Sequence, residues 1–558
     1  MVEFNELLVQ KFTDVFGKDD NVNDTDPTND LLIPIIPTFG NNDIMPHNIF
    51  TPGPNRWTKE YSHIWRKFIP EEQRHGFERG GWFSVEVIPN RLAVFSLNTL
   101  YFFDSNTAVD GCADKSEPGY EQMEWLRIQL QFLRQRGMKA ILMGHVPPAR
   151  TESKQSWDET CWQKYTLWMQ QYRDVVVGSV YGHMNIDHFM LQDFEDISKK
   201  ALKGNAAVSR MALNDEMTIQ SSAEYLTELR YDWSRIPDPP KMNANSLSGL
   251  SYFHDIFDSW TLRKKHKKSK EDKFLDKIGG EWAERYSLSL VSPSIVPNYF
   301  PTMRVVEYNI SGLDAASHIS TTHDMKHHDV GHYIQEEDDQ SDIDASHSQR
   351  KKGRKKKHHK PKKPDFVMPK PPSKSAPPGP AYSPQTFSWL GYTQYYANLT
   401  QINNDFTGHD DVVKEEGWHD GKHSGKTHEE KSKQHHKKFA YEVEYDTRKD
   451  SILGLEDLTV RKYLNIAGRI GQYKPAEGDR LKDGENDTTI DEADEHQPWA
   501  LPRSDEMIAQ KNKKYKKHHG GKHKHKHRRA INKIWFTFVN RAYVGTRDSE
   551  ELHDEFGQ

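Results

Sequence analysis

Three short stretches of the sequence place a metal-capable side chain directly after a glycine. Gly-Asn occurs at 40–41 and Gly-His at 144–145 and 182–183, and each pair follows an apolar run. Glycine lets the backbone approach a ligand closely, and amide oxygen and imidazole nitrogen are ligands for Zn, Fe or Mn. A single histidine after a strand is more often structural, but three such positions in order favour a metal site at one sheet edge. The candidate ligands are Asn41, His145 and His183.

These positions require strands that end at one edge of a sheet, and the alternation of apolar runs predicts such a sheet. The run 118–137 is a helix, because its leucines recur at helical spacing. The runs 82–88 and 91–103 are expected to pair as an antiparallel hairpin. Strands that alternate with helices indicate an α/β fold with helices covering a sheet. The other expected elements are strands at 31–39, 138–144 and 174–182 and a helix at 157–172.

Beyond residue 195 the ordered stretches are shorter and are separated by polar sequence. Apolar runs resume at 286–310, 386–403 and 458–468, and the run 533–546 alternates well enough to predict a strand that packs back on the main body. The expected division is an N-terminal helix and loop at 1–31, an α/β domain at 32–312, a charged and Pro-rich disordered insert at 313–382, a C-terminal region at 383–474 with a polar insert at 407–438, a Lys/His-rich disordered insert at 475–530 and a terminal strand at 531–558.

The composition supports one main ordered body and much polar sequence. Only 35% of the 558 residues are hydrophobic, and the net charge of −5 hides blocks of opposite sign, such as the acidic run 335–344 and the basic run 351–363. Like charges repel one another, so such blocks stay solvated. No stretch reaches the roughly 18 apolar residues of a membrane span. The first 20 residues predict a weak amphipathic helix with acids, which is not typical of a secretory signal.

The three glycine-containing stretches, written out as GNND, GHVPP and GHMNIDH, resemble the third, fourth and fifth blocks of the calcineurin-like metallophosphoesterases. The similarity is closer to the fungal vacuolar endopolyphosphatases, a branch related to acid sphingomyelinases, and SWDETCWQKY, VVEYNISGL and LGYTQYYANLTQ also carry it. The resemblance implies a β-sandwich flanked by helices and a hydrolase that uses two divalent ions (Mn, Co, Mg, Zn or Fe) to cleave phosphoanhydride bonds inside inorganic polyphosphate. It implies that Asn41, His145 and His183 bind one of these ions.

The sequence departs from the usual motifs of that family at two positions. Asn42 stands where the family has a histidine that assists the leaving group, and an amide cannot act as a general acid near neutral pH. His47 is a candidate to take over this role. Asn185 stands where the last block has a second histidine ligand, with Asp187 and His188 as nearby replacements.

The first two blocks of the family, Asp-x-His and Gly-Asp, have no counterpart in the 39 residues before Gly40. These blocks supply most of the first metal site and the carboxylate that bridges the metals. We therefore expect an amino-terminally truncated member that holds one ion or none, and its own activity stays open. The family is membrane-anchored and faces the vacuolar lumen, and its anchor is expected to be absent together with the missing blocks.

Two further features depend on the compartment. N-glycosylation sequons occur at Asn23, Asn309, Asn398 and Asn486. The chain has two cysteines, Cys112 and Cys161, and their spacing leaves two free thiols and one disulfide equally open. A luminal location, as the resemblance implies, would permit the disulfide.

Three basic runs would attract a linear polyanion such as polyphosphate by releasing counterions. They are residues 262–270, 351–363 and 511–529. The simpler interpretation is that they are solvated inserts, and nothing in them indicates a specific nucleic acid. The alternatives to an endopolyphosphatase are a sphingomyelinase-like phosphodiesterase, which would need a hydrophobic lipid-docking element, and a non-catalytic polyanion-binding protein. The oligomeric state stays open.

Overall fold

The computed structural model of the chain describes most of the α/β domain and several later stretches. The residues that it describes are 2–18, 30–151, 154–195, 197, 221–237, 239, 269–296, 299–313, 367–373, 377–399, 439–471 and 532–557. Most of the expected insert 313–382, and all of the inserts 407–438 and 475–530, lie outside these residues. The sequons at Asn23 and Asn486 also lie outside them.

The main sheet has six strands in the order β1-β2-β3-β4-β6-β5. Strands β2, β3, β4 and β6 run parallel, and β1 and β5 pair antiparallel at the two edges. The parallel strands therefore bring their carboxyl ends to one edge, which is what the candidate ligands require. The strands are β1 Phe83–Ile88, β2 Leu92–Ser96, β3 Lys139–Met143, β4 Val176–Tyr181, β5 His188–Asp193 and β6 Tyr286–Val291.

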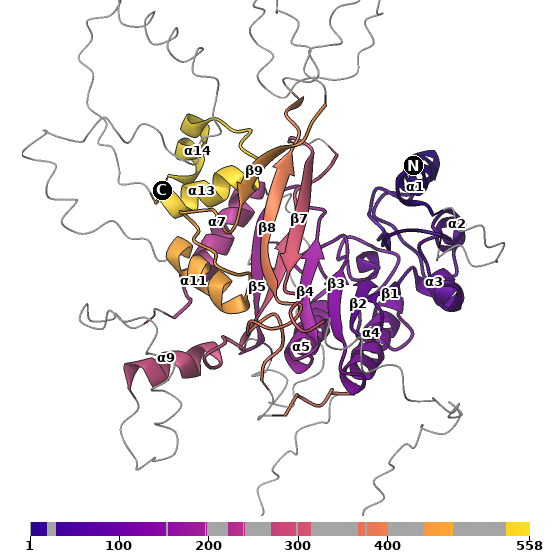
Figure 1. The fold of residues 1–558 in the computed structure, drawn as a ribbon, viewed down its shortest axis with the longest axis horizontal. Helices are drawn as coiled ribbons and strands as arrows, with labels where there is room; N and C mark the ends of the chain where they lie inside the picture. The colour runs from indigo at the N-terminus through magenta and orange to yellow at the C-terminus, as the bar shows by residue number, and fades with distance from the viewer. Residues whose placement is uncertain are drawn as a thin grey trace, which may run out of the picture.

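Helices flank this sheet, as the sequence predicts (Figure 1). On α4 the three leucines at helical spacing are all buried. On α5 the Asp158 side chain accepts a hydrogen bond from the Thr160 amide and so caps the first turn. The helices of this part are α1 Val2–Phe16, α2 Arg56–Ile64, α3 Arg74–Gly80, α4 Pro118–Gln135, α5 Glu159–Gln171, α7 Ser222–Trp233 and α9 Lys270–Ile278, with short 3-10 turns at Glu71–Gln73 and Thr99–Tyr101.

A second, antiparallel sheet has the order β7-β8-β9 and packs on the first. Figure 1 shows its strands alongside the main sheet, with a group of helices that includes the C-terminus to one side. The two sheets lie close together at Gly178 of β4, where an added Cβ would lie 2.6 Å from the Trp389 ring of β8. A residue without a side chain is required there. The elements are β7 Thr302–Tyr308, β8 Trp389–Tyr396, β9 Glu442–Asp446, α11 Val460–Gly471, α13 Lys533–Ala542 and α14 Ser549–Phe556.

Two sequence predictions of strands are wrong. The run 533–546 is mainly the helix α13, which the Asn532 side chain caps by accepting from the Trp535 amide. The helix does pack back on the main body, because Phe538 contacts Phe189 of β5 with ring centroids 5.8 Å apart. Its apolar residues recur at helical as well as alternating spacing, so the alternation alone was misleading.

The run 31–39 is extended but forms no strand. Pro34 and Pro37 lack the N–H groups that a β-ladder needs. Side chains join the run to the main sheet instead: Ser96 Oγ donates to the Pro37 carbonyl at 2.7 Å, and Thr38 Oγ1 donates to the Leu97 carbonyl at 3.0 Å. The run therefore still reaches the edge where β2 ends.

A disulfide joins Cys112, in the turn before α4, to Cys161 on α5. Both sulfur-bearing residues are fully buried. The structure thus selects the disulfide from the two alternatives that the sequence left open. None of the helices in the described ranges has the length and apolar character needed to cross a membrane.

Candidate metal centre

The three candidate ligands lie at the carboxyl edge of the main sheet. Asn41 follows the extended run 31–39, His145 lies two residues beyond β3, and His183 lies two residues beyond β4. Because β3 and β4 are parallel neighbours, their following loops emerge side by side. The structure thus brings together three side chains that are up to 142 positions apart in the sequence.

The three donor atoms face one another at short range. Asn41 Oδ1 lies 2.7 Å from His145 Nε2 and 3.2 Å from His183 Nδ1, and the two imidazole nitrogens are 3.2 Å apart. Atoms that bind one ion at about 2 Å lie about 3 Å from each other. The arrangement therefore fits a shared divalent ion. Without a cation, His145 Nε2 and His183 Nδ1 would each need a proton to hydrogen-bond to the Asn41 amide oxygen. These two protons would lie close together and repel each other.

The amide of Asn41 is held in the orientation that presents its oxygen. Its Nδ2 group donates to Asn48 Oδ1 at 2.8 Å and contacts His47 Nε2 at 2.9 Å. An amide nitrogen is a donor only, so His47 accepts with Nε2 and carries its proton on Nδ1. His47 therefore belongs to the centre. Its contact there is with a candidate ligand, which makes it a residue that orients Asn41.

The tight turn after residue 40 explains why this residue is a glycine. The Gly40 amide donates to Asp43 Oδ2 at 2.8 Å, and Asn5 of α1 donates to Asp43 Oδ1 at 3.3 Å. A Cβ at residue 40 would lie 3.1 Å from Asp43 Oδ2 and 3.3 Å from the His145 ring. The Asp43 carboxylate is thus engaged with the turn and with α1, and burial raises its pKa.

Both imidazoles are largely shielded from solvent. Burial lowers the pKa of His145 to about 4. Burial, with further contributions from His145, Lys154 and His47, lowers the pKa of His183 to about 3. Both rings are therefore neutral above about pH 5, which is the form that binds metals. The Phe103 ring lies edge-on to His183, with ring centroids 5.2 Å apart.

The other sequence candidates lie outside this group. Asn42 is exposed on the turn, and Asn185 is half-buried with a φ of 59°. In the part of the chain that the structure describes, neither forms a hydrogen bond with the three candidate ligands. His188 is buried, and its Nε2 lies 3.2 Å from the Tyr225 hydroxyl of α7. Asp187 is paired with Arg304. In this structure Asp187 and His188 are therefore engaged with partners other than the three candidate ligands.

Sequence reasoning missed two residues near the centre. Asn48 has a φ of 68°, and an asparagine in the left-handed conformation after a turn was the one local signal that could have identified it. Lys154, in the loop after β3, is half-buried and contributes to the lowered pKa of His183. No pattern in the sequence distinguishes it from other loop lysines.

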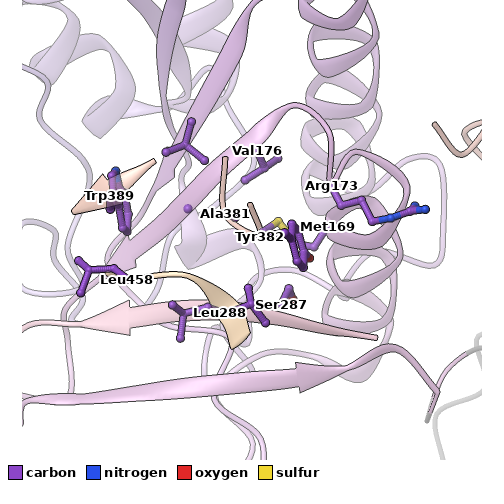
Figure 2. A pocket seen from close by; sticks show the side chains of 12 residues that line it. Met169, Arg173, Val176, Ser287, Leu288, Ala381, Tyr382, Trp389 and Leu458 are labelled. Atoms are coloured by element: carbon purple, nitrogen blue, oxygen red, sulfur yellow. The ribbon is translucent and has the colours of Figure 1, made fainter. Parts of the chain in front are cut away.

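The centre has two imidazoles and one amide. Over the described ranges, no group of three or more His, Cys, Asp and Glu side chains gathers in a way that could hold a metal ion. A separate cavity lies between the two sheets and is lined mainly by apolar side chains such as Met169, Leu288, Trp389 and Leu458 (Figure 2). It contains none of the candidate ligands, so it is a packing feature beside α5 and β4.

Curated relatives align with most of this chain. No family model matches the chain. It is 52% identical over 482 residues to an endopolyphosphatase of Neurospora crassa, in an alignment that covers 80% of this chain and 62% of that protein. It is 33% identical over 501 residues to an endopolyphosphatase of Saccharomyces cerevisiae (85% and 69%) and 30% identical over 483 residues to one of Schizosaccharomyces pombe (86% and 67%). The chain thus spans about three fifths of the Neurospora protein, and it belongs to the endopolyphosphatase family.

Proposed function

We propose that this chain provides metal ligands for the hydrolysis of phosphoanhydride bonds within inorganic polyphosphate chains. The observation that carries the proposal is the convergence of Asn41 Oδ1, His145 Nε2 and His183 Nδ1 within 3.2 Å of one another. The relatives named endopolyphosphatase support polyphosphate as the substrate.

Asn41, His145 and His183 would hold one divalent ion, with Mn, Co, Mg, Zn and Fe as candidates. When bound, such an ion stabilises negative charge on a phosphoryl oxygen. His47 and Asn48 keep the amide oxygen turned toward the imidazoles, and Phe103 covers one side of His183. Asn42 is exposed at the turn and has an amide that can donate a hydrogen bond to a leaving oxygen.

A place in the metallophosphoesterase superfamily, near the acid sphingomyelinases, is part of the proposal. The sequence motifs GNND, GHVPP and GHMNIDH support it. Enzymes of this kind use a pair of metal ions. The described residues fit one ion at the three neutral ligands, and Asn185, on the same loop as His183, is the residue available toward a second ion.

The proposal extends to a location in the vacuolar lumen, with glycosylation and membrane attachment as in the family. The Cys112–Cys161 disulfide supports an oxidising compartment. Two sequons lie in described segments. Asn309 follows β7 and Asn398 follows β8, and both are half-buried at the ends of these strands.

The test is to incubate the purified protein with long-chain polyphosphate and Mn²⁺, Co²⁺, Mg²⁺ or Zn²⁺ and to follow chain length on gels. We expect metal-dependent shortening that is lost in His183→Ala and kept in His75→Ala, because His75 is an exposed histidine on α3. Shortening that survives the loss of both His145 and His183 would overturn the proposal. Polyphosphate binding without cleavage under all four metals would identify the non-catalytic alternative.

A further inference from the structure

The last residue of the loop that carries His183 forms a buried ion pair. Asp187 Oδ1 lies 2.7 Å from Arg304 Nη2, and both side chains are more than nine-tenths buried. Asp187 is the last residue of the loop between β4 and β5, whereas Arg304 lies on β7 of the second sheet. The pair therefore joins the candidate metal centre to a part of the fold that contributes none of its ligands.

The remaining polar groups of Asp187 are also engaged with the C-terminal part of the chain. Its Oδ2 accepts a hydrogen bond from the Tyr445 hydroxyl of β9. Its amide donates to the Ala542 carbonyl at 3.0 Å, at the end of α13. Three separate elements thus hold this one residue in place.

The partners of Asp187 are themselves fixed by further contacts. Arg304 Nε donates to Gln394 Oε1 at 2.8 Å, and its guanidinium lies over the Tyr392 ring, 4.0 Å from the centroid. The hydroxyls of Tyr392 and Tyr445 are 2.9 Å apart. A charge held by so many contacts has little freedom to move, so the end of the loop is rigid.

The loop needs such an anchor because its conformation is unfavourable for the residues in it. It spans residues 182–187 only, and both His183 and Asn185 have positive φ, at 68° and 59°. Asparagine and histidine enter this backbone region more often than other residues with a side chain, but it is still sparsely populated and persists where the surrounding structure holds it. β4 fixes the start of the loop, and Asp187 fixes its end.

We propose that the Asp187–Arg304 pair is a positioning device that holds the His183 imidazole in its metal-binding orientation. This inference rests on the metal role proposed for His183. Neither residue would touch the ion or the substrate. Loss of the pair would let the loop relax, and the His183 nitrogen would spend less time opposite His145 and Asn41.

The main experiment compares Asp187→Asn with Asp193→Asn and measures Mn²⁺ affinity by titration and thermal stability in parallel. Asp193 is a matched control, because it lies at the other end of β5 and pairs with Arg285 at 2.7 Å. We expect Asp187→Asn to weaken Mn²⁺ binding about 10-fold or more, as the loss of orienting partners does at metal sites. Asp193→Asn should leave the affinity unchanged. Equal Mn²⁺ affinities in the two variants would overturn the inference.

Two further variants keep the result interpretable. His183→Ala separates the two proposals: if it leaves Mn²⁺ affinity unchanged, the metal role itself fails, whereas if it weakens binding and Asp187→Asn does not, only the positioning role fails. Arg304→Lys keeps the charge but cannot reach Asp187 and Gln394 together. We expect a smaller loss of Mn²⁺ affinity from it, and a folded Arg304→Lys with unchanged affinity would overturn the inference even if Asp187→Asn does not fold.

Discussion

The protein has two polar clusters that differ in their chemistry. One contains His183 and the other contains Asp187, four residues later in the chain. The candidate metal centre contains only neutral side chains, whose acceptor atoms face one another at the sheet edge. The cluster around Asp187 contains the full charges of Asp187 and Arg304, which are buried and paired with each other. The first cluster is completed by adding a cation, whereas in the second the Asp187 charge is already paired within the protein. Mutations at the first cluster should therefore affect mainly metal binding, whereas mutations at the second should affect folding stability and, through the His183 loop, metal binding as well.

The largest effect on stability is expected from Arg304→Met. The change leaves the Asp187 carboxylate buried without its cation, which typically costs about 3–5 kcal/mol in the free energy of unfolding. Urea denaturation of the purified variant would measure this loss. Replacing both partners, as Arg304→Met with Asp187→Leu, should recover most of it. A single variant with wild-type stability would show that the charged cluster does not depend on this pair.

A pH effect should distinguish the charged cluster from the neutral one. Glu444 of β9 has an Oε2 atom that is shielded from solvent and has no hydrogen-bond partner among the described residues. Burial, and then Asp187, raise its pKa to about 8 against the opposing effects of Arg541 and Arg304. The folded state therefore keeps a proton that the unfolded state loses above about pH 4.5. Stability contributed by this proton is present in acid and falls as the pH rises toward 8, by at most about 1.4 kcal/mol per unit.

Glu444→Gln tests this sign directly, because the amide cannot lose a proton. We expect a smaller decrease in melting temperature between pH 5 and pH 8 in the variant than in the wild type. The two proteins should have similar stability at pH 5. If the variant keeps the full pH dependence, Glu444 is not its source.

At the neutral cluster, His47→Ala should weaken divalent-metal binding by about 10-fold, which corresponds to about 1.4 kcal/mol. The variant removes one of the two contacts that orient the Asn41 amide. Its unfolding free energy should change little, because His47 is exposed. Isothermal titration with Mn²⁺ would measure the affinity, with His75→Ala as the control. A fall in stability without a fall in affinity would contradict the division between the clusters.

The smallest effect is expected from Asn532→Ala, which removes the cap of α13 and should cost about 1 kcal/mol. Because the Ala542 carbonyl at the other end of α13 accepts the Asp187 amide, hydrogen exchange at that amide should accelerate in the variant. Exchange at the amide of His145, which donates to Thr99 at 3.1 Å, should stay as in the wild type. The same increase at both amides would mean that the clusters respond as one unit.

The sequence predicted the neutral cluster but not the charged one. The reason is that the contacts of the charged cluster join residues that are far apart in the sequence. Asn41, His145 and His183 each follow an apolar run and a glycine, so each carries a local signal. Asp187 was named only as a possible metal ligand, because its partner Tyr445 lies 258 residues away in the sequence. His188 was named as a possible ligand because spacing along the chain cannot show that its Nε2 lies beside the Tyr225 hydroxyl of α7.

The secondary-structure predictions also succeeded where the local sequence pattern was clear and failed where it was not. The predictions for α4, α5, β3 and β4 are confirmed, because their patterns are long and bounded by turn residues. The run 31–39 failed as a strand because two prolines remove ladder donors, and 533–546 failed because its apolar residues fit two periods at once. Only the packing of Phe538 on β5 distinguishes these periods.

The hydrogen bond from the Asp187 amide to the Ala542 carbonyl has a consequence for biosynthesis. Ribosomes add roughly 5–20 residues per second, so about 360 residues and some 20 to 70 seconds separate the emergence of the His183 loop from that of its last anchor. During that interval Asp187 can already pair with Arg304 and then with Tyr445, but it lacks the backbone hydrogen bond to α13. A nascent chain that stalls or is cut before α13 would therefore carry every ligand residue of the centre without the support that completes it.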